Sequence, residues 1–231
     1  MAGIVKSNVV QKDLRIFCIL DTSSNMSKDG KIDILNRSMQ EMVEALQQAA
    51  RYNFEINPKI AVLAYSTACH WLTENGPENV TDFAWKKLKA GGSANLGSAL
   101  RELNHKLHFW MDPRMWFTPL ILFVSGGSAD DSWKAELEQL RQNRWFDCAT
   151  KIGFSTDQDM EILTSIVGHR ESVLHANNLD VFKKLIRVSP LMMNSHAESF
   201  FDWGQHPAAS IPVASEDALK YPDMLDMDDA W

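Results

Sequence analysis

The 231-residue chain has no uninterrupted apolar run approaching the roughly 20 residues of a membrane-spanning helix. Its first residues contain no long apolar stretch either, so we expect no signal peptide. Cysteine is also scarce. The three residues, Cys18, Cys69 and Cys148, lie in apolar surroundings at spacings unlike those of zinc ligands, which favours buried reduced thiols. These absences predict a cytoplasmic protein that does not contact a membrane.

Basic residues are outnumbered, with 23 Lys and Arg against 30 Asp and Glu, a formal net charge of −7. Such a balance argues against nucleic acid or an anionic membrane surface as the main partner. Much of the excess lies at one end of the chain, where Lys220 is the one cation after residue 213. The acids in that segment are Glu216, Asp217, Asp223, Asp226, Asp228 and Asp229. The rest of the chain is therefore close to neutral.

The length and the 45% apolar content suffice for one well-packed domain with an extension. We predict an N-terminal arm at residues 1–13 and a folded domain at residues 14–190. Residues 191–231 form an acidic C-terminal extension, because they contain several prolines and little periodicity. We leave open whether this extension is disordered or packs irregularly.

Short apolar runs alternate with amphipathic stretches along the predicted domain. Residues 16–20, 60–65 and 120–124 read as strands buried on both faces, with weaker candidates at 148–154 and 173–175. Helical spacing follows at residues 32–50, 96–107, 133–141, 160–167 and 179–186. Residues 70–72 follow the second strand too closely for a crossover, so we expect them to pair antiparallel at an edge. This order predicts an α/β fold, a doubly wound, mainly parallel sheet of about six strands with helices on both faces.

Three loops in this arrangement carry small polar or glycine residues. The first, residues 21–26, reads Asp-Thr-Ser-Ser-Asn-Met directly after a predicted strand. The second, residues 91–97, is glycine-rich and precedes a helix, and the third, residues 125–127, follows the 120–124 strand. If the first and third strands are neighbours where the strand order reverses, all three loops meet at one edge of the sheet. Oxygen-rich loops of this kind suit a hard cation or a partner's carboxylate.

These loops resemble the metal-ion-dependent adhesion site of the von Willebrand factor A (vWA) domain family. That site is built from Asp-x-Ser-x-Ser, a Thr in a Gly-Gly-Thr loop and an Asp in a Thr-Asp-Gly loop. In this chain the corresponding residues are Asp21, Ser23, Asn25, Ser93 and Gly126. The resemblance covers residues 14–186 and implies a vWA/Rossmann-like fold that binds protein partners, with Mg²⁺ as the family's metal.

The departures from the family pattern have physical consequences. Ser93 keeps a hydroxyl and Asn25 keeps an oxygen ligand, but Gly126 removes a carboxylate and leaves Asp21 as the single acid. A charge about 5 Å from a divalent cation is worth roughly 1.7 to 7 kcal/mol at effective dielectric constants of about 80 to 20. We therefore predict a degenerate metal site: Asp21, Ser23, Asn25 and Ser93 would be the ligands of any bound Mg²⁺, and the favoured expectation is no cofactor.

Within the family, residues 91–100 and 125–137 look most like the bacterial tellurite-resistance TerY-like group. That resemblance implies a cytoplasmic adaptor that operates with kinase, phosphatase or stress-response partners. Two further segments suggest contact residues. Trp110, Trp116 and Phe117 belong to an aromatic stretch that is either an exposed hot spot or a cap over the core, and Leu225 and Trp231 lie among the acids of the extension.

Enzymatic interpretations are weaker. Residues 126–130 read Gly-Gly-Ser-Ala-Asp after a strand, which places Ser128 as in the Gly-x-Ser-x-Gly pattern of serine hydrolases, but the final glycine of that pattern is missing. The 91–97 loop has no lysine after its last glycine, which argues against a phosphate-binding loop. The sequence thus favours a non-catalytic interaction module whose binding depends weakly or not at all on metal. A metal-dependent receptor for an acidic side chain, and a hydrolase using Ser128, remain the alternatives.

Overall fold

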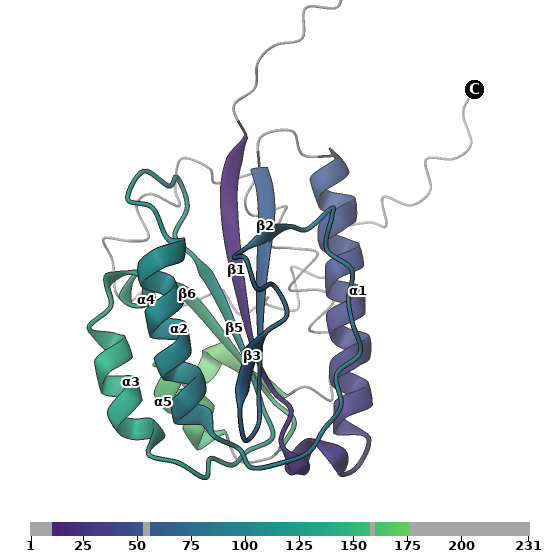
Figure 1. Cartoon of the computed structure of the whole chain (residues 1–231), viewed down its shortest axis with the longest axis vertical. Helices are drawn as coiled ribbons and strands as arrows, with labels where there is room; N and C mark the ends of the chain where they lie inside the picture. The colour runs from purple at the N-terminus through teal and green to yellow at the C-terminus, as the bar shows by residue number, and fades with distance from the viewer. Residues whose placement is uncertain (1–10, 53–55, 158–159, 176–231) are drawn as a thin grey trace, which may run out of the picture.

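The computed structural model describes residues 11–52, 56–157 and 160–175. A seven-stranded sheet lies between two layers of helices (Figure 1). Its order is β3-β2-β1-β5-β6-β7, with β4 pairing β2 off this path. The strands are β1 (Lys12–Asp21), β2 (Ile56–Tyr65), β3 (Cys69–Trp71), β4 (Glu78–Asn79), β5 (Leu120–Ser125), β6 (Thr150–Ser155) and β7 (Val173–His175). All neighbours are parallel except β3 and β4, which run antiparallel to β2.

The central strand β1 shows why these apolar runs form a sheet buried on both faces. Successive side chains of a strand point to opposite faces. Phe17 and Ile19 pack into the core on one side, while Cys18 and Leu20 pack into the core on the other. The register places Ile16 opposite both Ile60 of β2 and Leu120 of β5, so the three predicted central strands are adjacent.

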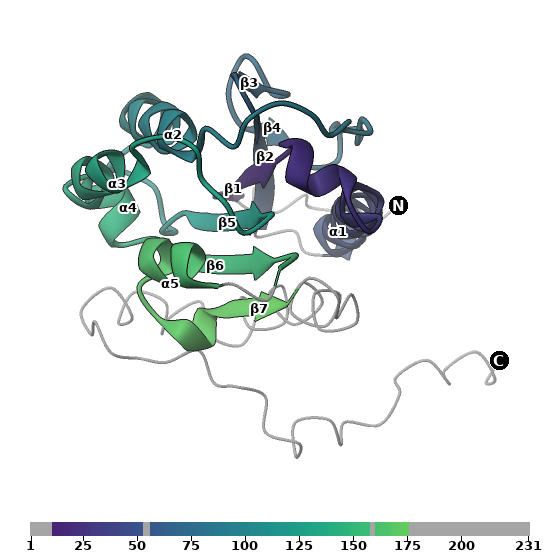
Figure 2. The ribbon, with the colours of Figure 1, turned by 90° about the horizontal axis from the view of Figure 1, so that it is seen from below.

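Helices cover both faces (Figure 2). Of the described helices, α1 (Lys31–Tyr52) covers one face and buries a stripe that includes Leu35, Met39, Met42 and Leu46. The other face carries α2 (Leu96–Trp110), α3 (Trp133–Arg141), the short α4 (Arg144–Asp147) and α5 (Glu161–Val167). Two 3-10 turns complete the described elements, η1 (Ser24–Ser27) and η2 (Arg170–Ser172).

A long extended segment, residues 80–92, runs from β4 past α1 to the start of α2, and we call it the strap. The Asn36 side chain of α1 hydrogen-bonds to the main chain of the strap, as a neighbouring strand would. Its Nδ2 donates to Leu88 O at 3.0 Å and its Oδ1 accepts from Leu88 N at 2.7 Å. Further along α1, Gln47 Nε2 donates to the carbonyls of Val80 and Phe83. The position of the second polar loop therefore depends on α1.

The predicted fold class is confirmed, including the antiparallel edge pairing, which the structure places at β3. β1 and β2 each begin four residues before the predicted strands. Their first four residues, Lys-Asp-Leu-Arg and Ile-Asn-Pro-Lys, are mostly polar or proline and so lack the continuous apolar signal. β4, α4 and the 3-10 turns were not predicted. The predicted helix at 179–186 and the acidic extension lie outside the described residues. In the described part of the chain, no helix combines the length and the apolarity needed to cross a bilayer.

Candidate functional site

The three polar loops meet at the carboxyl ends of β1 and β5, as predicted. The first and second loops are joined through their main chains, since Gly91 N donates to Thr22 O at 2.8 Å and Ser24 N donates to Gly92 O at 2.9 Å. The third loop joins the first where Gly126 N donates to Asp21 Oδ2 at 2.8 Å. We call these loops, residues 21–26, 91–97 and 125–128, the rim.

The buried carboxylate of Asp21 joins two loops of the rim. Its side chain is 0% exposed. Oδ1 accepts a hydrogen bond from Ser23 N at 2.8 Å, while Oδ2 accepts the one from Gly126 N. Burial raises the pKa of Asp21, the hydrogen bonds from Ser23 and Gly126 offset part of that rise, and the negative charge of Asp130 adds to it. The carboxylate thus organises two loops from a desolvated position.

Gly126 occupies the position at which the vWA pattern has its second acid. A Cβ at this residue would lie 3.1 Å from Asp21 Oδ2, 3.2 Å from Met26 Sδ and 3.3 Å from Asn25 Cβ. Such distances require the neighbours to give way by a few tenths of an ångström. The absence of a side chain at 126 therefore lets the third loop approach Asp21 closely.

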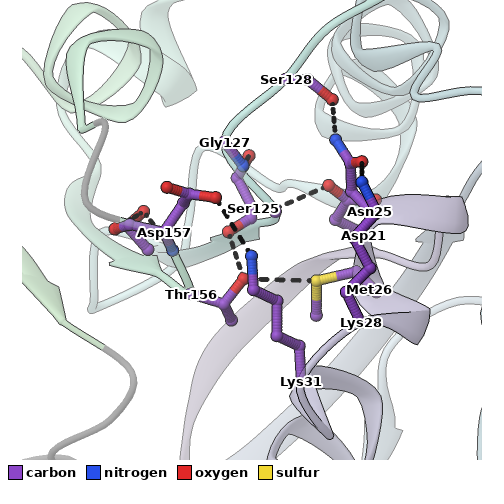
Figure 3. Close-up of polar contacts among 12 residues, drawn as sticks. Asp21, Asn25, Met26, Lys28, Lys31, Ser125, Gly127, Ser128, Thr156 and Asp157 are labelled. Atoms are coloured by element: carbon purple, nitrogen blue, oxygen red, sulfur yellow. Dashed lines mark hydrogen bonds and ion pairs between the residues drawn. The ribbon is translucent and has the colours of Figure 1, made fainter.

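Figure 3 shows how Asn25 is engaged. Its Nδ2 donates to Ser128 Oγ at 2.6 Å, which ties the first loop to the third. Its Oδ1, the atom that would bind a metal, accepts a hydrogen bond from the ammonium group of Lys28 at 3.3 Å. Lys31 forms an ion pair nearby, with its Nζ 3.1 Å from Asp157 Oδ2. Sequence reasoning missed both lysines, because nothing in their spacing links them to the loops.

Ser23 and Ser93 are in contrasting environments. Ser23 is 1% exposed, and its Oγ makes no hydrogen bond of acceptable geometry, although the hydroxyl lies close enough to Asp21 to help hold down the pKa of that residue. Ser93 is exposed, and its main-chain N–H donates to Thr67 Oγ1 at 3.0 Å. Gly92, at φ 83°, is required beside it, because a Cβ there would collide with Thr67 Oγ1.

Asp130 and Asp131 directly precede α3, a position where acids favour a helix N-terminus. Their side chains bond to the second loop instead. Asp130 Oδ2 accepts from Ala94 N at 2.7 Å. Asp131 accepts from Gly97 N at 2.8 Å and Ser98 N at 3.0 Å, and so caps α2 from another part of the chain. Neither carboxylate replaces the acid missing at Gly126.

The donor set at the rim is incomplete for a divalent ion. Mg²⁺ and Ca²⁺ are held by several oxygen ligands, usually including more than one carboxylate. Here Asp21 is the single carboxylate at the centre, and Asn25 Oδ1 already faces an ammonium group. Among the described residues, no three acidic, histidine or cysteine side chains converge as a metal site would require. The buried, unpaired hydroxyl of Ser23 is the one feature that would suit an additional ligand.

Ser128 lacks the surroundings of a hydrolytic nucleophile. Its Oγ accepts a hydrogen bond from the amide of Asn25. His169 and His175, which follow it in the sequence, are exposed, and His169 faces Glu171. A serine nucleophile needs a base within hydrogen-bond reach, and within the described part of the chain the observed partner of Ser128 is an amide.

The aromatic stretch divides between core and surface. Phe117 is 7% exposed and packs in the α1-side core, and Trp110 packs against Phe17 and Trp71 on the opposite side. Trp116 is 62% exposed, and so is Phe109 at 66%, which sequence reasoning did not single out. Helical spacing could have indicated this difference. Trp110 follows the buried Leu107 by about one turn and so lies on the same face of α2, whereas Phe109 does not. The other predicted contact residues, Leu225 and Trp231, lie outside the described residues.

Comparisons with known proteins bear on the fold. No protein-family model matches the chain, and no curated protein matches it. Solved structures do. A von Willebrand factor type A protein from Catenulispora acidiphila has a TM-score of 0.58 at 13% identity, over 78% of this chain and 43% of that one. The pilus adhesin SpaC from Lactobacillus rhamnosus GG has a TM-score of 0.59 at 10% identity, over 80% of this chain and 30% of that one.

Proximal thread matrix protein 1 from the mussel byssus, in a structure with a zinc-occupied MIDAS motif, has a TM-score of 0.55 at 14% identity. That match covers 77% of this chain and 48% of the other. The chain therefore spans less than half the length of these structures. At such low identities the likeness establishes the vWA-like fold alone, and a fold does not by itself determine a function.

Proposed function

We propose that the chain is a non-catalytic protein-interaction module of vWA type whose binding does not depend on a metal. The proposal rests on one observation above all, the direct hydrogen bond from Gly126 N to Asp21 Oδ2. At the position where the vWA pattern supplies a second acid, the main chain itself contacts the first. Lys28 reinforces this arrangement by placing a positive charge on Asn25 Oδ1.

The partner would meet two parts of the folded domain and, in addition, the acidic extension. One is the rim, where exposed Ser24 and Ser93 flank the Lys28–Asn25 contact. The other is the exposed indole of Trp116, since Trp is among the residues that contribute most to protein interfaces. The acidic extension with Leu225 and Trp231 supplies a third contact segment in this proposal.

The resemblance to the TerY-like group supports a setting for this module. We propose an adaptor in a bacterial cytoplasmic stress-response or signalling complex, with kinase or phosphatase components among its partners. The acidic net charge agrees with a protein partner and not with nucleic acid.

Affinity capture from the native cell tests the proposal. The full chain should retain the same partner proteins in Mg²⁺ and in chelator, and Trp116→Ala should reduce their recovery. Lys134→Ala removes an exposed side chain on α3 and serves as the control, because it shows whether any surface substitution lowers recovery. Loss of every partner in chelator would contradict the metal-independent proposal, and unchanged recovery by Trp116→Ala would remove that indole from it.

A metal-dependent receptor is the second candidate, favoured by the unpaired Ser23 hydroxyl. Calorimetry with Mg²⁺ and Mn²⁺ separates the two. Clear binding that Asp21→Ala abolishes would establish the metal-dependent form and overturn the preferred one.

A further inference from the structure

The middle of the strap carries cations without counter-ions. Residues 83–92 include Lys86, Lys87 and Lys89 and no acid. All three lysines are exposed, and none forms an ion pair in the described part of the chain. Exposed acids of the neighbouring elements, Asp82 at the start of the strap and Asp33 in the first turn of α1, do not contact them either.

The same stretch has the conformation of a strand. Residues 83–91 contain no helix, turn or bend. The side chain of Asn36 bonds both main-chain groups of Leu88, with Oδ1 2.7 Å from Leu88 N and Nδ2 3.0 Å from Leu88 O. These are the two hydrogen bonds that a neighbouring strand would form. α1 therefore occupies one edge of the strap at this point.

The opposite edge of the strap is unpaired. Main-chain groups of successive residues in a strand point to opposite edges, so those of Lys87 and Lys89 point away from Asn36. In the described ranges they have no hydrogen-bond partner. Main-chain groups without a partner in the protein are normally bonded to water, and both residues are exposed. Figure 1 shows the strap in front of α1, which leaves the side away from this helix accessible.

The side chains of the strap follow the same alternation. Leu88 and Ala90 pack against the core cluster on the α1 side of the sheet. Lys87 and Lys89 therefore project from the other face of the strap. A strand added along the free edge would place every second side chain beside these two lysines, with Cβ atoms about 4.5 to 5.5 Å apart.

We propose that the free edge of the strap binds an extended segment of a partner protein in which Glu or Asp recurs at alternate positions. The main chain of that segment pairs with Lys87 and Lys89, and its carboxylates accept from their ammonium groups. Lys86 adds a further positive charge beside them. An unpaired strand edge supplies the affinity through its main chain, and the lysines select the acidic segment.

The strap leads directly into the rim. Gly91 N donates to Thr22 O, and Gly92 O accepts from Ser24 N. A segment bound along Lys87 and Lys89 would thus continue onto the rim contact. This inference rests on the proposed function, to which it adds the charge and the conformation of the partner segment.

Nuclear magnetic resonance titration of the isotope-labelled full chain tests the proposal. The probe is a peptide of alternating Glu and Thr with blocked ends, about eight residues long, within the usual length of a strand. We expect saturable shifts of the Lys87, Leu88 and Lys89 amide signals, and several-fold slower hydrogen exchange of the Lys87 and Lys89 amides. A peptide of the same composition with all its Glu residues at one end, and one of alternating Lys and Thr, should bind much more weakly.

Two sets of variants separate charge from main-chain pairing. Lys87→Gln/Lys89→Gln should weaken binding of the alternating Glu peptide about fivefold. Its matched control is Lys134→Gln/Arg144→Gln, which removes the same charge from exposed residues of α3 and α4 that form no ion pair within the described residues. Lys89→Pro also removes a main-chain donor from the free edge, so it should bind about threefold more weakly than Lys89→Gln.

Absence of saturable binding, equal binding of the two Glu peptides, or shifts centred away from the strap would each overturn the proposal. Slow exchange of the Lys87 and Lys89 amides in the free chain would overturn it too, because another segment, such as the acidic extension, would then already pair with this edge. These measurements use a synthetic peptide, so their failure leaves the affinity capture free to support the proposed function.

Discussion

Gly126 N lies 2.8 Å from Asp21 Oδ2, so a main-chain donor contacts the acid at the centre of the rim. A side chain at 126 would crowd this contact, because its Cβ would lie 3.1 Å from Asp21 Oδ2. With glycine there, the loop after β5 lies close to Asp21 and shares the carboxylate that also fixes Ser23.

Restoring an acid at this position should create metal dependence. Gly126→Asp places a second carboxylate beside a buried one, and at roughly 5 Å their repulsion costs about 1 to 3 kcal/mol without a counter-ion. We expect thermal unfolding of the variant to be destabilised in chelator and largely recovered in Mg²⁺, while the parent chain responds to neither. Gly126→Asn imposes a similar steric demand without the charge and should show no recovery. If Asp and Asn variants behave alike in Mg²⁺, the rim cannot hold the ion even with two acids.

Asp21 should make stability depend on pH in a defined direction. Burial raises the pKa of its carboxyl in the folded state, so the folded chain holds the proton more tightly than the unfolded chain. Its contribution to stability is therefore more favourable below the unfolded pKa and is lost as pH rises through the folded pKa. Asp21→Asn removes this pH dependence and replaces one acceptor oxygen by an NH2 group, at a cost of about 1 to 3 kcal/mol of unfolding free energy. Urea unfolding should show a larger deficit of the variant at pH 4 than at pH 7.

Asp112→Asn provides the opposite case. The hydrogen bonds from Arg114 lower the pKa of Asp112, so its contribution is present above the unfolded pKa and is lost as pH falls. The small difference between parent and this variant should persist down to the unfolded pKa of about 4 and shrink, not grow, as the pH is lowered further to about 2. If the stability deficits of Asp21→Asn and Asp112→Asn changed in the same direction with pH, the environment of one of these two carboxylates would be misassigned.

Neighbouring aromatic residues should respond differently to truncation. Phe117→Ala empties a core position and should cost about 3 to 5 kcal/mol of unfolding free energy. Trp116→Ala removes an exposed ring whose described contact is with Lys12, and should cost less than about 1 kcal/mol. Chemical denaturation of the two variants, each measured against the parent, checks the contrast. A large loss for Trp116→Ala would place that indole in the fold and not at an interface.

Asp131 should stabilise α2 although it lies outside that helix. Asp131→Ala leaves Gly97 N and Ser98 N without their acceptor and should lower stability by about 0.5 to 2 kcal/mol. Asp131→Asn keeps one acceptor oxygen and should recover part of the loss. Ser132→Ala is the useful comparison, since Ser132 precedes α3 and its side chain makes no capping hydrogen bond. Equal effects of Asp131→Ala and Ser132→Ala would contradict the cross-loop cap.

The sequence predicted the sheet well because burial on both faces requires continuous apolar runs, and Ile16, Ile60 and Leu120 all belong to such runs. The meeting of the three loops followed from βαβ connectivity without knowledge of any contact. The predicted helix at 160–167 ends where Gly168 follows, and the structure gives this glycine a left-handed φ of 96°, as is common at a helix C-terminus.

The side-chain partners at the rim could not be predicted in the same way. Asp130 and Asp131 are good helix-starting residues, and local reasoning assigns them to the next helix. Their actual partners, Ala94 and Gly97, lie more than thirty residues earlier. Likewise, Lys28 reaches Asn25 only because the η1 turn brings them together. Such pairings depend on how loops fold back in three dimensions, which composition and periodicity do not encode.

The anchoring of the strap on α1 has a consequence for how the rim can evolve. Asn36 and Gln47 lie on α1 and hydrogen-bond to the strap at Leu88, Val80 and Phe83, ahead of the glycines at 91 and 92. A screen for variants that have lost binding should therefore find substitutions at Asn36 and Gln47 as well as in the loops. Substitutions in this one helix would shift the rim while every residue of the rim itself stayed the same.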